Sequence, residues 1–350
     1  MTNPRPPLEL SKNFRYSRKP TENCFLKYRS TWRIGAMSVC GPGHISFFNF
    51  LAPPGGRRRR ASLVVVVSAV GLLQCGIGNP IERHELWFGV FDVGQGLAQM
   101  AVEGKRAVAW DMGDSSNYDR WKKAYNRIGA PSIAYIVISH AHSDHYGGLS
   151  CLDPGIDFSG IVVTGPYADT ALLRAKAGFW KNRLVFRTIC QGDTLAGLND
   201  VRVECLWPPE EDDLTAHGIS SDDVNRMSLC FMVRHRHVSV MMTGDIDTVA
   251  MRILAHSYEE RLNTDAIVVP HHGSRFSLDA LFYGFANPEV AVISCGEDND
   301  NEHPAPDVLR FLSFQCGVTV FRTDKQGTVM GRGNGEYWTW SDERGEREDN

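Results

Sequence analysis

Three histidines and one aspartate lie within six residues of this sequence, at His140, His142, Asp144 and His145. Imidazole nitrogens and carboxylate oxygens are the ligands that zinc and similar divalent ions take in proteins. The apolar run 133–138 before them predicts a buried strand, and alternation at the strand end points His140 and His142 to the same side. This short segment therefore predicts a site for two adjacent metal ions.

Two further loops are candidates to complete such a site. Asp245 follows the apolar run 238–242, and a carboxylate at a strand end can bridge two cations because each oxygen binds one; a Gly-Asp pair by itself is also typical of an ordinary turn. His271 and His272 follow a third apolar strand. One of them would complete the shell of the second ion and the other would orient a ligand or contact substrate. We favour His271 as the ligand.

A fourth candidate is His303, which precedes Pro304 at the entry to a predicted helix. This histidine would donate a proton to a leaving group or hold an anionic oxygen; a surface histidine in a helix-entry loop is the alternative. The expected assignment gives one ion His140, His142 and Asp245, gives the other Asp144, His145, His271 and Asp245, and makes Asp144, His272 and His303 the catalytic residues.

Strand-like and helix-like segments between residues 85 and 340 must position these loops. Apolar runs rich in Val, Phe and Ile predict strands at 86–93, 98–102, 107–110, 133–139, 184–189, 201–207, 228–233, 238–243, 266–269, 290–294 and 318–322, with a closing hairpin at 327–331 and 336–340. Helices are predicted at 118–128, 168–179, 248–262, 278–285 and 306–314. Strands come in runs at both ends with helices between them, which predicts an α/β fold of two sheets packed face to face with helices outside.

The charges of the 350-residue chain are unevenly distributed. Residues 1–60 hold twelve Lys or Arg and two Glu, a charge of +10, which leaves −14 for the rest of a chain with a net charge of −4. An acidic body is not the footprint of a general nucleic-acid binder, although it allows a local basic groove. Four of the nine cysteines, Cys190, Cys205, Cys230 and Cys295, lie in apolar runs, so we expect buried thiols rather than disulfides.

The N-terminal part differs in composition from the rest. Four consecutive arginines precede a charge-free apolar run and Cys75, a pattern that resembles a signal peptide or a lipoprotein segment and is too short for a membrane span. It predicts export to the periplasm or cell envelope, or membrane anchoring; a cytoplasmic location follows if the segment is mis-annotated. The expected organisation is a disordered or mis-annotated leader at 1–56, the signal-like segment at 57–80, a hydrolase domain at 81–340 and a charged, disordered tail at 341–350.

The spacing His-x-His-x-Asp-His resembles the signature of the metallo-β-lactamase superfamily. More narrowly, several motifs in order resemble the hydrolase domain at the end of ComEC-type competence proteins: Phe91-Asp92-Val93-Gly94-Gln95-Gly96, Asp111-Met112-Gly113, His140–Gly148, Thr243-Gly244-Asp245, Pro270-His271-His272-Gly273-Ser274, Glu302-His303-Pro304 and Arg322-Thr323-Asp324 with Gly327. The resemblance covers roughly residues 86–340. It implies an αββα sandwich, two mixed β-sheets flanked by helices, with a metal site at one edge of the sheets.

Two departures from the family pattern concern the site. Leu97 stands where the family loop often has an aspartate. Many superfamily members also place a further histidine between the first motif and the bridging aspartate, and only His217, His235 and His237 lie in that interval here. We expect His235 and His237 to be exposed beside a hairpin turn. The first ion is therefore expected to have fewer protein ligands, with water or Ser228 nearby.

The ligand set and the resemblance together predict a metal-dependent hydrolase. It would use two divalent metal ions, zinc ahead of manganese, to activate a water molecule. A phosphodiesterase or nuclease is the leading interpretation, and Arg275 is expected to contact a phosphate. The alternatives are a hydrolase of a small ester, lactam, thioester or phosphorylcholine ester, and a non-enzymatic metal-binding protein with a degenerate site. The expected partners are a phosphodiester or small-ester substrate, nucleic acid and, through the N-terminal segment, a membrane.

Overall fold

The structure is a computed structural model, and it describes residues 65–66, 85–216 and 219–344. The predicted leader at 1–56 and nearly all of the signal-like segment at 57–80, including Cys75, lie outside the described residues. Within the described part, no helix combines the length and the apolar character that a membrane crossing requires.

Nine strands form the first sheet, which is mixed. Across the sheet they are β1 (Val65–Val66), β16 (Trp338–Asp342), β15 (Val329–Gly333), β2 (Leu86–Val90), β3 (Gln99–Glu103), β4 (Arg106–Trp110), β5 (Ser132–Ile138), β6 (Ile161–Thr164) and β7 (Val185–Thr188). Neighbours from β16 to β4 are antiparallel, whereas neighbours from β4 to β7 are parallel. The carboxyl ends of β4 and β5 therefore leave the sheet at the same edge.

Seven strands form the second sheet, which is also mixed. Their order is β14 (Thr319–Arg322), β13 (Val290–Ile293), β12 (Ala266–Val268), β11 (Val238–Met242), β10 (Cys230–His235), β9 (Val201–Trp207) and β8 (Thr194–Leu195). The strands from β11 to β14 are parallel neighbours, and those from β8 to β11 are antiparallel. The ends of β11, β12 and β13 therefore also meet at one edge.

The apolar faces of the two sheets pack against each other and helices cover the outer faces. Phe88 and Val108 of the first sheet and Phe231 and Val240 of the second belong to one buried core between the sheets. Two further cores lie between each sheet and its helices. The helices are α1 (Tyr118–Arg127), α2 (Ser143–Tyr146), α3 (Thr170–Lys176), α4 (Glu211–Ala216), α5 (Thr248–Tyr258), α6 (Ala280–Ala286), α7 (Pro306–Arg310) and α8 (Thr323–Gln326).

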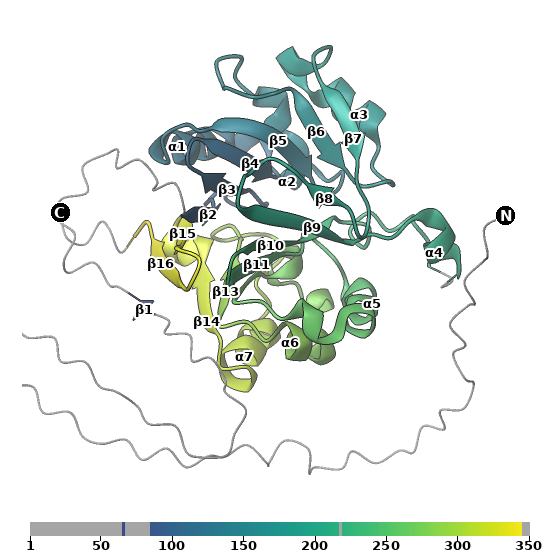
Figure 1. Cartoon of the computed structure of the whole chain (residues 1–350), viewed down its shortest axis with the longest axis vertical. Coiled ribbons are helices and arrows are strands. Elements are labelled where there is room, and N and C mark those ends of the chain that lie inside the picture. Colours follow the sequence, from purple (N-terminus) through teal and green to yellow (C-terminus); the bar gives the residue numbers. More distant parts are fainter. Residues whose placement is uncertain (1–64, 67–84, 217–218, 345–350) are drawn as a thin grey trace, which may run out of the picture. The chain divides into compact units, whose positions relative to one another are not determined.

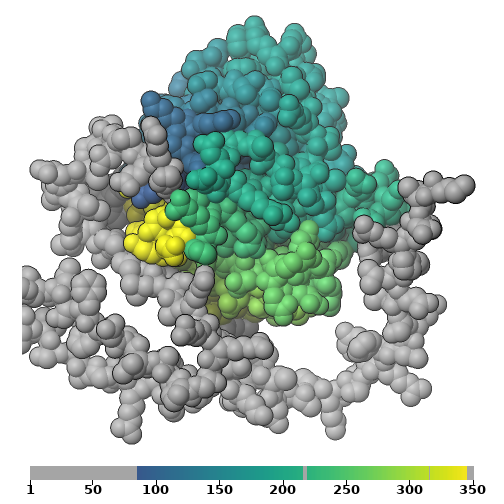
Figure 2. Space-filling view, in the orientation of Figure 1, coloured from purple at the N-terminus to yellow at the C-terminus, as the bar shows by residue number. Residues whose placement is uncertain are grey.

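The two layers are visible in both views of the described residues. In Figure 1, α1 and α3 lie with β4 to β7 on one side and α5, α6 and α7 lie on the other. In Figure 2, the blue-to-teal atoms of the first part of the chain are in contact with the green atoms of the second part. The predicted αββα sandwich of two mixed sheets flanked by helices is confirmed.

Several predicted elements differ at their ends. Strand β6 was not predicted. The helix predicted at 248–262 ends at Tyr258 and continues as a 3₁₀ turn, Glu259–Leu262. Strand β16 runs to Asp342, past the predicted start of the tail at residue 341, because Asp342 pairs with Val329 of β15.

The cysteines in the described part of the chain are free thiols. Cys205, Cys230 and Cys295 are buried, as predicted. Cys190 is only partly buried, which corrects the prediction for that residue: it follows the end of β7, and its Sγ lies 3.6 Å from Asp193 Oδ2. Burial and this carboxylate raise the pKa of Cys190 to about 11, so the thiol stays protonated near neutral pH.

Candidate metal centre

The predicted site residues other than His303 follow the carboxyl ends of strands, and so does Asp111. Asp111 follows β4, and the segment 139–145 follows its parallel neighbour β5. Asp245 follows β11, and His271 and His272 follow the parallel neighbour β12. Parallel neighbouring strands end at the same edge of a sheet, so each sheet has two of these loops side by side at one edge. The loops of the first sheet lie against those of the second, as the contacts of Asp245 with His140 and His145 show.

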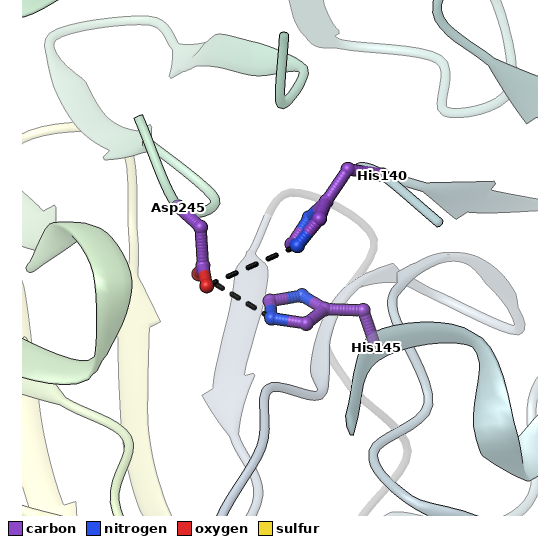
Figure 3. Close-up of side chains that lie close together, drawn as sticks. All are labelled: His140, His145 and Asp245. Carbon is purple, nitrogen blue, oxygen red and sulfur yellow. Dashed lines mark ion pairs between the residues drawn. The ribbon is translucent and has the colours of Figure 1, made fainter. Parts of the chain in front are cut away.

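His140, His145 and Asp245 form the middle of this centre, and their side chains point toward one another (Figure 3). His145 Nε2 lies 3.3 Å from Asp245 Oδ1, and His140 Nε2 lies 3.9 Å from Asp245 Oδ2. All three residues are buried, and one ligand atom from each lies within 4.8 Å of the others. Both distances exceed the range of about 2.7–3.2 Å that is usual for an N–H···O hydrogen bond. They suit ligand atoms that surround a metal cation.

A second group combines Asp144, His145 and His272, again with ligand atoms within 4.8 Å of one another. His272 Nε2 lies 3.4 Å from Asp144 Oδ2 and 3.6 Å from Asp245 Oδ2. His145 Nε2 lies 3.9 Å from Asp144 Oδ2. His145 therefore belongs to both groups, and Asp245 faces residues of both, which is the arrangement that a bridging carboxylate requires.

The geometry reverses the order expected for His271 and His272. The side chain of His272 is 3% exposed and approaches both carboxylates, whereas that of His271 is 24% exposed and its Nε2 lies 3.8 Å from Asp245 Oδ2. Both residues have left-handed backbone, with φ of 50° and 56°. This unusual turn directs His272 inward and leaves His271 nearer to solvent, so the structure favours His272 as the ligand.

His142 lies at the exposed side of the centre. Its ring centroid is 4.7 Å from that of His140, and the residue is solvent-exposed. His142 is not a member of either candidate ligand group found among the described residues. Its role as a ligand of the first ion therefore stays a prediction.

Hydrogen bonds on the far side of two imidazole rings aim their Nε2 atoms into the centre. His145 Nδ1 donates to Asp111 Oδ2 at 2.8 Å. The Ser139 hydroxyl donates to the same oxygen at 2.7 Å and accepts from His140 Nδ1 at 3.1 Å. Such partners fix the tautomer of a ligand histidine. The sequence pattern alone assigns no role to Asp111, although its position directly after a predicted strand, like that of Asp245, is a usable signal.

Four buried atoms of the centre have no hydrogen-bond partner: Nε2 of His140, His145 and His272, and Oδ1 of Asp245. His272 Nδ1 donates to the carbonyl oxygen of Ser294 at 2.9 Å, so its Nε2 carries the free lone pair. Unpaired polar atoms are rare in protein interiors because burying them is costly. Three imidazole nitrogens and a carboxylate oxygen that converge in this way fit a divalent metal ion.

The carboxylates set the charge of the centre. Burial by itself would lower the pKa of His145, but Asp245 and Asp111 outweigh it and hold the pKa well above its usual value. The same balance, with Asp245 and Asp144, raises the pKa of His272. Burial would raise the pKa of Asp245, but His145 and His272 outweigh it and lower the pKa. A bound cation would replace these protons, because a ligand histidine must be neutral.

His303 lies beside the two histidines of the 270–273 turn. Its ring centroid is 5.6 Å from that of His271 and 6.1 Å from that of His272. Asn299 holds its backbone, with Nδ2 donating to the His303 carbonyl at 2.7 Å and Oδ1 accepting from the His303 amide at 2.8 Å. Burial and the two neighbouring histidines lower the pKa of His303 to about 4. The ring is therefore neutral near pH 7, and its Nδ1 is buried without a partner.

The prediction that His235 is exposed is wrong. His235 is fully buried, while His237 is exposed as predicted. His235 shares the inward face of β10 with Phe231 and Val233, which belong to the core between the sheets. It lies at the hairpin end of β10, opposite to the end near the centre, so it cannot serve as a ligand. His217 lies outside the described residues.

The loop that contains Leu97 packs against Asp144. The Leu97 amide donates to the Asp144 carbonyl at 3.0 Å. Gly96, with φ of 135°, has no room for a side chain, because a Cβ there would lie 2.5 Å from the same oxygen. The Leu97 side chain is buried in the core between the sheets. The loop therefore positions Asp144 through its backbone.

Part of this chain is similar to proteins of a known family. Residues 93–170, which include the cluster from His140 to His145, match the model of the Metallo-beta-lactamase superfamily. Among solved structures, the metallo-beta-lactamase fold protein YhfI from Bacillus subtilis is similar, with a TM-score of 0.48 and 12% identity; the match covers 71% of this chain and all of that one.

Three curated relatives extend the similarity beyond that segment. Competence protein ComA of Neisseria gonorrhoeae is 26% identical over 257 residues, which are 72% of this chain and 33% of ComA. ComE operon protein 3 of Bacillus subtilis is 24% identical over 217 residues, 61% of this chain and 26% of that protein. Recombination protein 2 of Haemophilus influenzae is 25% identical over 226 residues, 63% of this chain and 26% of that protein. The similarity thus spans a third or less of each relative.

Proposed function

We propose that this chain, whose residues 93–170 match the model of the Metallo-beta-lactamase superfamily, is a metal-dependent phosphodiesterase that acts on nucleic acid or a related phosphodiester. The observation that carries the proposal is the convergence of four unpaired buried atoms, three imidazole nitrogens and one carboxylate oxygen, from loops of both sheets. No packing role accounts for such a group, whereas metal ligation does.

The ligands divide between two ions that share one carboxylate. We assign His140, His142 and Asp245 to the first ion, and Asp144, His145, His272 and Asp245 to the second, with His272 in place of His271. When bound, the two divalent cations supply the positive charge that activates water and stabilises the phosphoryl oxygens. The imidazole-rich set favours zinc, with manganese as the alternative.

The protein's own side chains position the reacting groups. The Asp144 side chain is 32% exposed, so water can reach it. Burial would raise its pKa, but the neighbouring imidazoles of His272 and His145 outweigh burial and hold the pKa well below its usual value, so the carboxyl is ionised. Asp144 can therefore accept a hydrogen bond from the attacking water and orient it. His303, neutral and close to His271, donates a hydrogen bond to the leaving oxygen.

Two observations favour a nucleic-acid phosphodiester over a small ester. Arg275 is exposed directly beyond Ser274, whose amide donates to the His271 carbonyl at 2.8 Å, so a cation lies close to the centre and can contact a phosphate. One similar protein is named a recombination protein, and nucleic acid is the substrate class that recombination requires.

Parallel assays of the full chain test this proposal. Purified protein with added Zn²⁺ or Mn²⁺ is given bis-p-nitrophenyl phosphate, single-stranded DNA, RNA, a lactam and a thioester. We expect phosphodiester cleavage that stops when the metal is chelated. Cleavage of the lactam or thioester alone would support the small-ester alternative, and bound metal with no turnover would support a metal-binding protein.

We also propose that the segment 57–80 directs export or membrane attachment through Cys75. The support is its sequence pattern of arginines, apolar residues and cysteine. Fractionation of cells that express the full chain tests this: the wild type should appear with membranes, and Cys75→Ala should release it. An unchanged soluble distribution of both proteins would contradict attachment.

A further inference from the structure

Ser228 is a fully buried residue whose hydroxyl has no hydrogen-bond partner, beside the metal centre. A Cβ built on Gly244 would lie 2.9 Å from Ser228 Cβ and 3.3 Å from Ser139 Cβ. Ser139 directly precedes His140, and Gly244 directly precedes Asp245. Ser228 is therefore packed between the two segments that deliver the ligands of the first ion.

Backbone hydrogen bonds fix this position across the two sheets. The amide of Leu229, at the entry to β10, donates to the Ser139 carbonyl beyond β5 at 2.9 Å. The Ser228 amide donates to the Asn225 carbonyl at 3.0 Å. The side-chain Oδ1 of Asn225 is also buried without a partner. The segment 225–228 thus contains two buried oxygen atoms without a partner, and its Ser228 packs against the residue that precedes Asp245.

An unpaired buried hydroxyl destabilises a fold unless a partner satisfies it. His140 Nε2 and Asp245 Oδ1, from the residues that follow Ser139 and Gly244, are unpaired as well. A single partner that satisfies an imidazole nitrogen, a carboxylate oxygen and a hydroxyl oxygen is a divalent cation with its bound water.

We propose that Ser228 is an oxygen donor to the shell of the first ion, in the place that a third histidine would otherwise take. The inference rests on the proposed function, because it requires an ion at His140 and Asp245. It also has a consequence for metal choice. Oxygen donors suit manganese better than imidazoles do, so a hydroxyl in this place should let the first ion accept Mn²⁺ more readily than a third histidine would.

Metal titration of the full-length protein tests this without reference to activity. Protein stripped with a chelator is titrated with Mn²⁺ by calorimetry and by electron paramagnetic resonance. The wild type should bind two ions, and Ser228→Ala should weaken one of the two affinities by about tenfold and leave the other unchanged. Tyr283→Phe is the matched control, because it removes a different buried unpartnered hydroxyl, on α6, and should leave both affinities unchanged.

Thermal unfolding separates this role from a merely structural one. Ser228→Ala removes a hydroxyl that is unsatisfied in the metal-free protein, so the Tm of the metal-free variant should rise in either case. If the Ser228 hydroxyl faces no ion, the further rise in Tm on adding Mn²⁺ equals that of the wild type. That result would overturn the inference. We expect the variant to show a smaller metal-induced rise in Tm than the wild type.

A second variant changes the donor rather than removing it. Ser228→Cys puts a softer sulfur donor in the same place, so the ratio of Zn²⁺ to Mn²⁺ affinity at one site should rise; an unchanged ratio would count against Ser228. The two proposals fail differently. A wild type that binds no ion refutes both, whereas a wild type that binds two ions with the same affinities as the Ser228 variants refutes only this inference.

Discussion

At Asp245, one buried carboxylate faces every other residue of the two ligand groups except Asp144. Its Oδ1 lies 3.3 Å from His145, and its Oδ2 lies 3.9 Å from His140 and 3.6 Å from His272. In the absence of an ion, these histidines stabilise the negative charge of the carboxylate, and the pKa of Asp245 is therefore lowered. Because Asp245 contacts residues of both groups, its substitution should weaken the binding of both ions.

We predict that Asp245→Ala abolishes phosphodiester turnover and lowers the metal content of the purified protein. The reason is that the shared carboxylate is a ligand in both assigned shells. Metal is measured by plasma mass spectrometry and turnover with bis-p-nitrophenyl phosphate, with circular dichroism to show that the variant is folded. A variant with full metal and full activity would contradict the bridging assignment.

His271 and His272 offer a direct comparison between adjacent residues. Because His272 approaches both carboxylates and His271 approaches only Asp245, His272→Ala should lose more metal than His271→Ala. Equilibrium dialysis against Zn²⁺ measures the difference, which we expect to be about tenfold or more in affinity. The opposite order would restore His271 as the ligand.

For His303 we predict a loss of turnover without a loss of metal. Its ring lies beside the centre, and its lowered pKa makes it a neutral hydrogen-bond donor near pH 7. His303→Ala should lower kcat by roughly 10²-fold or more, which is the usual contribution of a hydrogen-bond donor to a developing negative charge. If the variant binds less metal than the wild type, His303 is a ligand instead.

Two properties of the strands place the side chains. One is the edge of the sheet at which a strand ends, and the other is the alternation of its side chains between the two faces of the sheet. Parallel pairs, β4 with β5 and β11 with β12, bring Asp111, His140 and Asp245 to one place. The alternation of β10 buries His235 beside Phe231 and Val233. Burial, followed by the charge of Arg236, lowers the pKa of His235, so this strand contains a neutral histidine that acid would have to charge.

His235 should therefore contribute to acid sensitivity. A histidine whose folded pKa is lowered binds its proton less readily when folded than when unfolded, so stability falls as the pH drops from about 6.5 toward the folded value. In urea unfolding of chelator-treated protein, His235→Leu should lose less stability between pH 7 and pH 5 than the wild type. The difference in slope cannot exceed about 1.4 kcal/mol per pH unit for one proton. Equal slopes would mean that folding does not change the pKa of His235.

Across the whole domain, the metal centre joins the two sheets. The ligands from 140 to 145 follow the first sheet, and those at 245 and 272 follow the second. Ions held by both sets bind the folded state and have no preformed site in the unfolded chain. Binding of the proposed ions is therefore expected to stabilise the packing of the two sheets.

We accordingly predict that chelation lowers the Tm of the wild-type protein. With free metal at about 100 times Kd, one bound ion adds about 2.7 kcal/mol to the free energy of unfolding. Differential scanning calorimetry with and without Zn²⁺ measures the change, and Asp245→Ala should remove most of it. A Tm that is independent of metal in the wild type would show that no ion links the sheets.

The sequence by itself determined the kinds of ligand and most of the elements that carry them. The cluster from His140 to His145, the carboxylate at Asp245 and the apolar runs before them are local patterns, and local patterns report the period of strands and helices. The combination of motifs added the αββα sandwich, because several short motifs in a fixed order are specific to one family.

Only the tertiary structure decided which atoms face the centre. The choice of His272 over His271 depends on two left-handed residues in one turn, and the burial of His235 depends on a second sheet packed over β10. The roles of Asp111 and Ser228 at the centre depend on contacts between segments that are far apart in the chain. Sequence periodicity describes one segment at a time, whereas these outcomes are set by the backbone of a turn and by the packing of one sheet against the other.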